Sequence, residues 1–267
     1  TVINISKKKF DLALNNNGTS LHGGVTGFDK VNWKVVSYDD KNYSSLKLNY
    51  LSKDMEEGYP GNLNVYVTYI LTNENELAVQ YYAETDKTTI LNLTQHSYFN
   101  LSGESSGDVL DHNLEIYADS YLPVNKKIIP TGDIEKVQGT PFDFMNSKKI
   151  GRDIDLENNQ LILGNGYDHC WVLNDFDGGV RKIASANSDQ SGIQMDVYTD
   201  QPGVQLYTGN FLNGSISSKQ GLKYEKRSGF CLETQHFPDS PNKESFPNVY
   251  LKPGQVFKSK TVFKFIF

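Results

Sequence analysis

The chain has 267 residues, of which 26 are Lys or Arg and 32 are Asp or Glu, so its formal net charge at pH 7 is −6. This negative balance argues against nucleic acid or an anionic membrane surface as the partner, because both attract clustered positive charge. The two cysteines, Cys170 and Cys231, are too few for a disulfide scaffold, and no apolar run is long enough for a membrane-spanning helix.

Short segments rich in Val, Ile, Thr and aromatic residues recur along the whole chain, which is typical of β-strands. In chain order, we expect strands near residues 32–36, 45–51, 63–71, 77–82, 88–93, 113–117, 170–173, 193–198, 204–207, 230–234 and 255–267. The clearest pair flanks the turn Asn73-Glu74-Asn75 and predicts a β-hairpin.

Helical periodicity is weak throughout. We expect one short helix around Ser147 to Ile154, and few others. Many strands with few helices predict an all-β fold, a large antiparallel sandwich, and the absence of repeats or linkers favours a single domain over residues 1–267.

Four polar residues interrupt strand-like or glycine-rich segments. His22 precedes two glycines, His96 lies among aromatic residues, and Asp168 follows a glycine-rich turn. Glu233 lies in the apolar run around Leu232, where a carboxylate is costly to bury unless it is hydrogen-bonded or used. Each also has a plainer interpretation, because histidines often fill cores, strand glutamates often face solvent, and aspartates often form turns.

A metal site is a weaker interpretation of the same residues. His22, His96, His169 and Asp168 are suitable ligand types, but none is paired at a spacing typical of metal sites. His112 and His236 are interpreted as surface or structural residues.

Eight stretches in order resemble the aldose 1-epimerase (galactose mutarotase) family. One of them reads Asn92-Leu93-Thr94-Gln95-His96-Ser97-Tyr98-Phe99-Asn100-Leu101. The others are 20–24 with 27–29, 56–63, 122–124 with 129–132, 139–144, 166–169, 201–210, and 229–235 with 238–242. Together they cover the chain from about Phe10 to its end.

The resemblance implies a β-sandwich of the galactose mutarotase type and interconversion of the α and β anomers of aldohexoses such as galactose and glucose. It implies that Glu233 is the general base and His96 the general acid. Because Glu233 lies in an apolar run and His96 among aromatic residues, we expect both to be partly desolvated, with the sugar between them rather than the two side chains touching. His22, Asp168 and Gln205 match residues that hold the sugar. Neither a metal nor an organic cofactor is implied.

The N-terminal part departs from the family pattern. Family chains normally carry several more strands before the point where this chain begins, and they include an Asn-Arg pair whose Arg contacts the sugar. Counting back from Phe10 places Ile3 and Asn4 at that pair, so we expect Asn4 at the edge of the sugar site without the cationic fork of Arg.

Three hypotheses follow from these observations. The first is an active mutarotase; the alternatives are a catalytically impaired sugar-binding relative and an epimerase of a phosphorylated hexose. The last would need a basic cluster near the site, and Lys7-Lys8-Lys9 is the available run.

The last expectations concern the compartment, the oligomeric state and the partner of the protein. We expect a cytoplasmic monomer whose partner is a small monosaccharide. The start at Thr1 indicates a processed terminus or a missing N-terminal piece. Secretion stays an alternative, because six Asn-x-Ser/Thr sequons would permit glycosylation, at Asn4, Asn17, Asn42, Asn92, Asn100 and Asn213.

Overall fold

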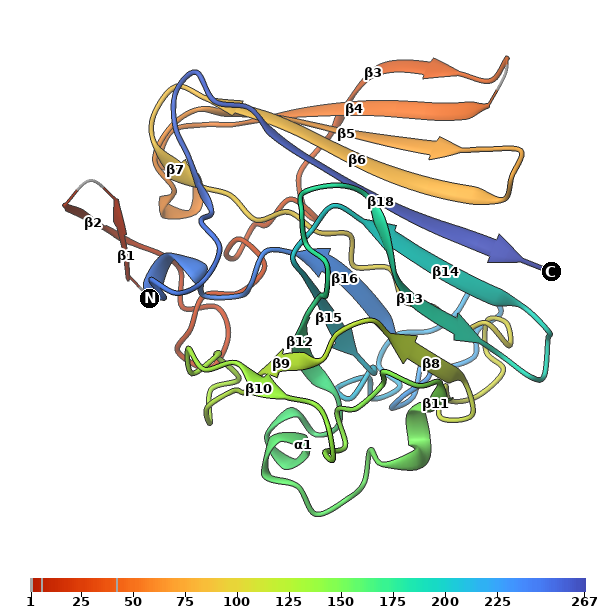
Figure 1. Ribbon diagram of the computed structural model, residues 1–267. Helices are drawn as coiled ribbons and strands as arrows, with labels where there is room; N and C mark the ends of the chain where they lie inside the picture. Colours follow the sequence, from red (N-terminus) through yellow and green to blue (C-terminus); the bar gives the residue numbers. More distant parts are fainter. Residues whose placement is uncertain (1, 6, 42) are drawn as a thin grey trace. The chain divides into compact units, whose positions relative to one another are not determined.

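The computed structural model describes residues 2–5, 7–41 and 43–267 (Figure 1). The chain forms two compact units: unit 1 contains Thr1–Leu93 and Asp239–Lys260, and unit 2 contains Thr94–Pro238 and Thr261–Phe267. The prediction of a single domain over residues 1–267 stays a prediction. The sequon at Asn42 lies outside the described residues, and so do Thr1 and the Ser6 of the sequon at Asn4.

Unit 1 is built on antiparallel strands that follow one another along the chain. A hairpin is followed by a four-stranded meander and a short strand pair: β1 (Val2–Ile5) and β2 (Lys8–Asp11); β3 (Lys34–Asp39), β4 (Ser44–Ser52), β5 (Leu63–Leu71) and β6 (Glu76–Thr85); β7 (Thr89–Ile90) and β17 (Tyr250–Leu251). The predicted hairpin is confirmed as β5 and β6. Alternate residues of β5, beginning with Leu63 and Val65, are buried and pack with Phe28 and Trp33, as the period of two in the sequence requires.

Unit 2 contains two antiparallel sheets. The first has the order β11-β8-β13-β14-β18 and the second the order β10-β9-β12-β15-β16. Their strands are β8 (Asn113–Ile116), β9 (Ser120–Leu122), β10 (Glu135–Lys136), β11 (Lys148–Lys149), β12 (Asp168–Val172), β13 (Arg181–Asn187), β14 (Gln194–Thr199), β15 (Gly203–Tyr207), β16 (Cys231–Gln235) and β18 (Phe257–Ile266). The last strand begins in unit 1, and its residues from Thr261 onward pair with β14.

The two sheets of unit 2 share one hydrophobic core. Trp171, Leu206 and Leu232 of the second sheet are buried in the same cluster as Val197 and Phe263 of the first. Burial of these large side chains supplies most of the driving force for packing one sheet on the other. The predicted antiparallel β-sandwich is confirmed.

Helices are few and short, as predicted, but the helix expected around Ser147 to Ile154 is wrong. That segment forms β11 and a 3₁₀ turn, Ile150–Arg152, and the α-helix follows as α1 (Asn159–Gly164). The Asn158 side chain starts α1 by accepting hydrogen bonds from the Gln160 and Leu161 amides. Within the described ranges, no helix is long and apolar enough to cross a membrane.

Candidate active site

One face of the second sheet of unit 2 carries polar side chains at its centre. Strands β12, β15 and β16 run side by side (Figure 1), and Gln205 pairs with Glu233 on one side and with Cys170 on the other. Because side chains alternate along a strand, this register places Asp168, Gln205 and Glu233 on the same face. The residues next to them along each strand point into the core. Three of the predicted site residues are therefore brought together by strand register.

A tight turn at Gly166 precedes β12 and positions Asp168 on this face. Gly166 has a φ of +130°, and a Cβ there would collide with the side-chain amide of Asn210. The Asn210 amide in turn donates to the carbonyls of Gly164 and Tyr167, at 3.0 and 2.8 Å. Glycine is therefore required two residues before Asp168.

Gln205 links to Asp168 across the strands. Its Nε2 donates to Asp168 Oδ1 at 2.8 Å, and its Oε1 is buried with no hydrogen-bond partner among the described residues. Burial raises the pKa of Asp168 to about 6, against the opposing effect of the Gln205 hydrogen bond. The pair thus offers acceptor oxygens to a hydroxyl-bearing ligand.

His96 lies against Glu233. The Nε2 atom of His96 is 3.3 Å from Glu233 Oε1. The segment after His96 is held to the residue before β16 by reciprocal backbone hydrogen bonds between Phe99 and Phe230, of 2.8 and 2.9 Å. The two side chains therefore touch in the structure without sugar, and the expectation that a bound sugar lies between them stays a prediction.

Glu233 is only 7% exposed, although it carries an ionisable group. Burial, followed by the nearby charge of Asp168, raises the pKa of Glu233 to about 8. A carboxyl group that exchanges its proton near neutral pH, next to an imidazole, is suited to general acid–base chemistry.

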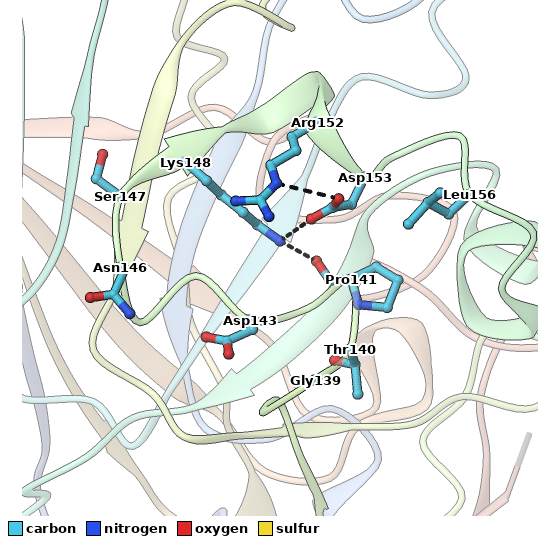
Figure 2. Close-up of a pocket in the computed structure, with 10 residues that line it drawn as sticks. All are labelled: Gly139, Thr140, Pro141, Asp143, Asn146, Ser147, Lys148, Arg152, Asp153 and Leu156. Atoms are coloured by element: carbon cyan, nitrogen blue, oxygen red, sulfur yellow. Dashed lines mark hydrogen bonds and ion pairs between the residues drawn. The ribbon is translucent and has the colours of Figure 1, made fainter.

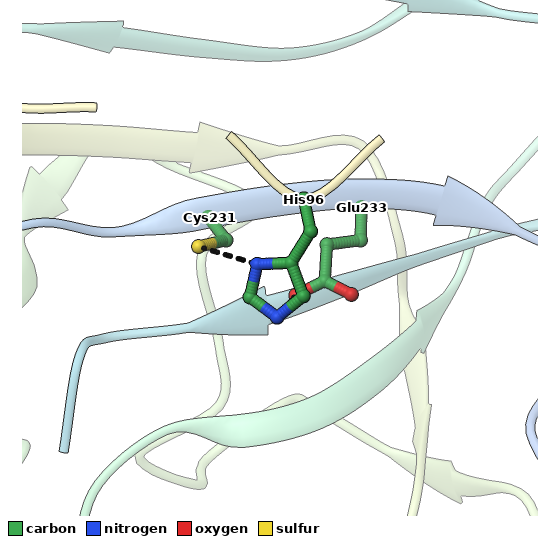
Figure 3. Close-up of side chains that lie close together, drawn as sticks. All are labelled: His96, Cys231 and Glu233. Atoms are coloured by element: carbon green, nitrogen blue, oxygen red, sulfur yellow. Dashed lines mark hydrogen bonds and ion pairs between the residues drawn. The ribbon is translucent and has the colours of Figure 1, made fainter. Parts of the chain in front are cut away.

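Cys231 is a member of this site that sequence reasoning gave no role. Its Sγ lies 3.4 Å from His96 Nδ1, on the other side of the ring from the carboxylate (Figure 3). The signal was available, since Cys231 is two residues from Glu233 on one strand and must share its face.

Three ligand types for a metal ion therefore meet here. Ligand atoms of His96, Cys231 and Glu233 lie within 4.8 Å of one another. The two ring nitrogens of His96 face different partners, however, so one ion bound through one nitrogen could not replace both contacts. The prediction that the protein needs no metal or cofactor stays a prediction.

The other histidines of unit 2 are structural. His169 is fully buried and points to the core side of β12, where its Nδ1 accepts from the Asp168 amide at 3.2 Å. Burial lowers the pKa of His169 to about 3, so the ring is neutral. His112 Nε2 accepts from the Leu101 amide at 2.9 Å, and His236 Nδ1 contacts Gln201 Oε1 at 2.9 Å.

The remaining predicted residues, His22 and Asn4, belong to unit 1. His22 has a left-handed φ of +52°, in a loop held by Glu57, which accepts from the Val25 and Thr26 amides at 3.0 and 2.9 Å. Gly24 has a φ of +113°, which residues with a side chain rarely adopt, so this turn favours glycine. Asn4 is exposed on β1, and its contribution to sugar binding, like that of His22, stays a prediction.

A hollow elsewhere in unit 2 lacks this chemistry. It has a volume of about 420 Å³ and is lined by residues between Gly139 and Leu156 (Figure 2). Its buried cation, Lys148, already donates to Pro141 O and Asp153 Oδ2, each at 2.7 Å. We therefore interpret Lys148 as a structural residue that ties this loop together.

Several known proteins are similar to this chain in both sequence and fold. The family model described as "Aldose 1-epimerase" matches residues 3–264. Galactose mutarotase of Bos taurus is 47% identical over 262 residues, covering 97% of this chain and 72% of that protein, and that of Homo sapiens is 46% identical, covering 98% and 73%. The crystal structure of galactose 1-epimerase from Lactobacillus acidophilus superimposes with a TM-score of 0.87 at 31% identity, covering 99% of this chain and 75% of that one.

The antiparallel fold and these likenesses together define an enzyme of the isomerase class. The chain belongs to the aldose 1-epimerase family.

Proposed function

We propose that this protein interconverts the α and β anomers of an aldohexose, with Glu233 as the general base and His96 as the general acid. The single observation that carries the proposal is the 3.3 Å contact between His96 Nε2 and the buried carboxyl of Glu233. Opening a sugar ring needs one group that removes a proton and another that supplies one, and this pair offers both within reach of the same small substrate.

The proposed reaction begins when the Glu233 carboxylate takes the proton of the C1 hydroxyl. The C1–O1 bond becomes a carbonyl, the electrons of the C1–O5 bond move to the ring oxygen, and that oxygen takes the Nε2 proton of His96. Rotation about C1–C2 exposes the other face of the aldehyde, and closure reverses both transfers. The pKa of Glu233, raised by burial to about 8, makes its carboxylate a stronger base than an exposed glutamate.

Asp168 and Gln205 are proposed to hold the sugar hydroxyls. Their position on the same face as Glu233 and the unpartnered Gln205 Oε1 support this role. His22 and Asn4 are proposed as further sugar contacts from the resemblance alone. Galactose is the proposed substrate because the relatives bear its name, and glucose is proposed from the resemblance.

We further propose a monomer that acts in the cytoplasm. Cys170 and Cys231 are both free and buried, as suits a reducing compartment. Sedimentation of the purified chain at several concentrations tests the monomer directly, because a dimer would raise the mass with concentration.

Polarimetry on freshly dissolved α-galactose and α-glucose tests the reaction. We expect the protein to accelerate the change in rotation, and Glu233→Gln and His96→Asn each to lose about 10² to 10⁴ in kcat. Glu157→Gln, which alters an exposed carboxylate of the same unit, is the matched control and should keep full activity.

Calorimetry with galactose and polarimetry with hexose 6-phosphates separate the alternatives. A protein that binds galactose without accelerating its mutarotation would be a catalytically impaired sugar-binding relative. A protein that acts on hexose 6-phosphates but not on free hexoses would be an epimerase of a phosphorylated hexose. Either result would overturn the proposal.

A further inference from the structure

The two ring nitrogens of His96 have chemically different neighbours. Nε2 lies 3.3 Å from the Glu233 carboxyl, and Nδ1 lies 3.4 Å from the Cys231 thiol (Figure 3). The thiol and the carboxyl come from the same face of β16, two residues apart, so the strand itself spaces them to flank one imidazole.

The ring is also held in its plane. Tyr98 stacks on His96, with ring centroids 5.2 Å apart and an interplanar angle of 23°, and Tyr207 lies edge-on at 6.2 Å. These aromatic contacts restrict tilting but do not distinguish one nitrogen from the other. Of these four contacts, the polar ones to Glu233 and Cys231 are those that can select a tautomer.

The proposed reaction demands one tautomer in particular. His96 gives its Nε2 proton to the ring oxygen and must take it back on closure, so the neutral ring that exists between the two steps carries its proton on Nδ1. A group that accepts a hydrogen bond from Nδ1 throughout the cycle would hold this tautomer.

We propose that Cys231 is a positioning residue whose sulfur accepts the Nδ1–H of His96 and so leaves Nε2 free to exchange its proton with the sugar. The inference rests on the proposed role of His96 as the acid. Sulfur is a weak acceptor, which suits a partner that orients the ring without adding a charge to it.

The environment of Cys231 keeps the thiol neutral. The side chain is fully buried, and burial, followed by the charges of Glu233 and Asp168, raises the thiol pKa. At Nδ1, a neutral sulfur leaves the imidazolium a better proton donor than a second carboxylate in that position would, because a negative neighbour stabilises the charged ring.

The test compares Cys231→Val with Cys231→Ser. Valine removes the acceptor, whereas serine retains one. Loss of one neutral hydrogen bond predicts that Cys231→Val lowers kcat about three- to tenfold and changes KM less than about twofold. Cys231→Ser should stay within about twofold of the unaltered protein. Glu157→Gln, which alters an exposed side chain of the same unit, is the control and should have no such effect. If Cys231→Val does not fold, Cys231→Ala replaces it.

The tautomer is read directly by ¹⁵N NMR of the histidine rings without sugar, at a pH where His96 is neutral. We expect Nδ1 to be protonated in the unaltered protein and in Cys231→Ser, and the proton to move toward Nε2 in Cys231→Val. A ring protonated on Nε2 in the unaltered protein, or a tautomer unchanged by valine, would overturn the inference. Because this signal needs no turnover, its outcome is separate from that of the polarimetry.

Discussion

Two carboxyl groups are buried in antiparallel strands of unit 2, and their hydrogen-bonding and charged partners differ. Asp196 on β14 is 5% exposed, and Glu233 on β16 is 7% exposed. Asp196 forms an ion pair with Lys182 at 2.7 Å and accepts from Ser185 Oγ and Gln194 Nε2, at 2.7 and 2.8 Å. Glu233 has the imidazole of His96 beside it and a second carboxyl group, Asp168, nearby.

The two environments move the pKa values apart. Burial acts to raise the pKa of Asp196, but its hydrogen bonds with Lys182, Ser185 and Gln194 outweigh burial and lower the pKa. Burial and the charge of Asp168 raise that of Glu233 to about 8. Partners that fix the charge of Asp196 make it a structural residue, whereas Glu233, without a permanent cation among its described contacts, is left able to exchange a proton.

The largest expected difference is in catalysis. Glu233→Gln should lower kcat by about 10² to 10⁴, because an amide cannot take the C1 hydroxyl proton. Asp196→Asn, the same chemical change in the structural carboxyl, should keep kcat within about twofold, with both rates measured by polarimetry on folded protein. Comparable losses in the two variants would contradict the division of roles.

For the free energy of unfolding we expect the larger loss in Asp196→Asn rather than in Glu233→Gln. Asp196→Asn leaves Lys182 without its carboxylate and should cost about 2 to 4 kcal/mol at pH 7, measured by urea unfolding. Because the folded-state pKa of Asp196 is lowered, this stabilisation is present above the ordinary carboxyl pKa and is lost as pH falls through the folded value. A difference between the two proteins that stays constant into the acid range would contradict this account.

Glu233→Gln should have a smaller effect on stability, of opposite sign. The folded protein keeps the Glu233 proton up to about pH 8, whereas the unfolded chain releases it near 4.5, so ionising this residue lowers stability as pH rises between these values. The variant should match the unaltered protein near pH 5 and exceed its unfolding free energy by about 1 to 3 kcal/mol above pH 8. Glu157→Gln, at an exposed position of the same unit, is the control and should change the unfolding free energy little.

The smallest expected effect concerns the link between β15 and β12. Gln205→Ala removes the 2.8 Å hydrogen bond to Asp168 and one proposed sugar contact. We expect KM for galactose to rise about three- to tenfold with a smaller fall in kcat, because one neutral hydrogen bond contributes about 1 kcal/mol. An unchanged KM would remove Gln205 from the sugar site.

Local patterns predicted much of the fold. Alternation within 63–71 and the turn at Asn73-Glu74-Asn75 were sufficient for the β5–β6 hairpin, since neighbouring strands joined by a short turn pair with each other. Strand β13 was missed because Arg181-Lys182-Ile183-Ala184-Ser185-Ala186-Asn187 contains few β-branched or aromatic residues, and its place in the sheet comes from pairing with β14 and β8. The helix was misplaced because α1 depends on its Asn158 cap more than on apolar spacing.

The candidate site was predictable in its residues but not in its contacts. The sequence context singled out Glu233, His96 and Asp168 as polar residues in strand-like or glycine-rich segments, and the resemblance supplied Gln205 and the roles of all four. Their arrangement depends on the register of three strands that are distant in sequence and on the loop that brings His96 to β16. For the same reason the contacts of His96 with Glu233 and Cys231 could not be read from spacing alone.

The most direct test of the contrast between the two buried carboxyl groups is the titration of Glu233 itself. Protein labelled with ¹³C at the glutamate carboxyl carbons, compared with the same labelled protein carrying Glu233→Gln, isolates this signal in an NMR pH titration. We predict a midpoint near 8, set by burial and by Asp168. A midpoint near 4.5, the value of an ordinary glutamate, would contradict the claim that this carboxyl is held ready for proton transfer.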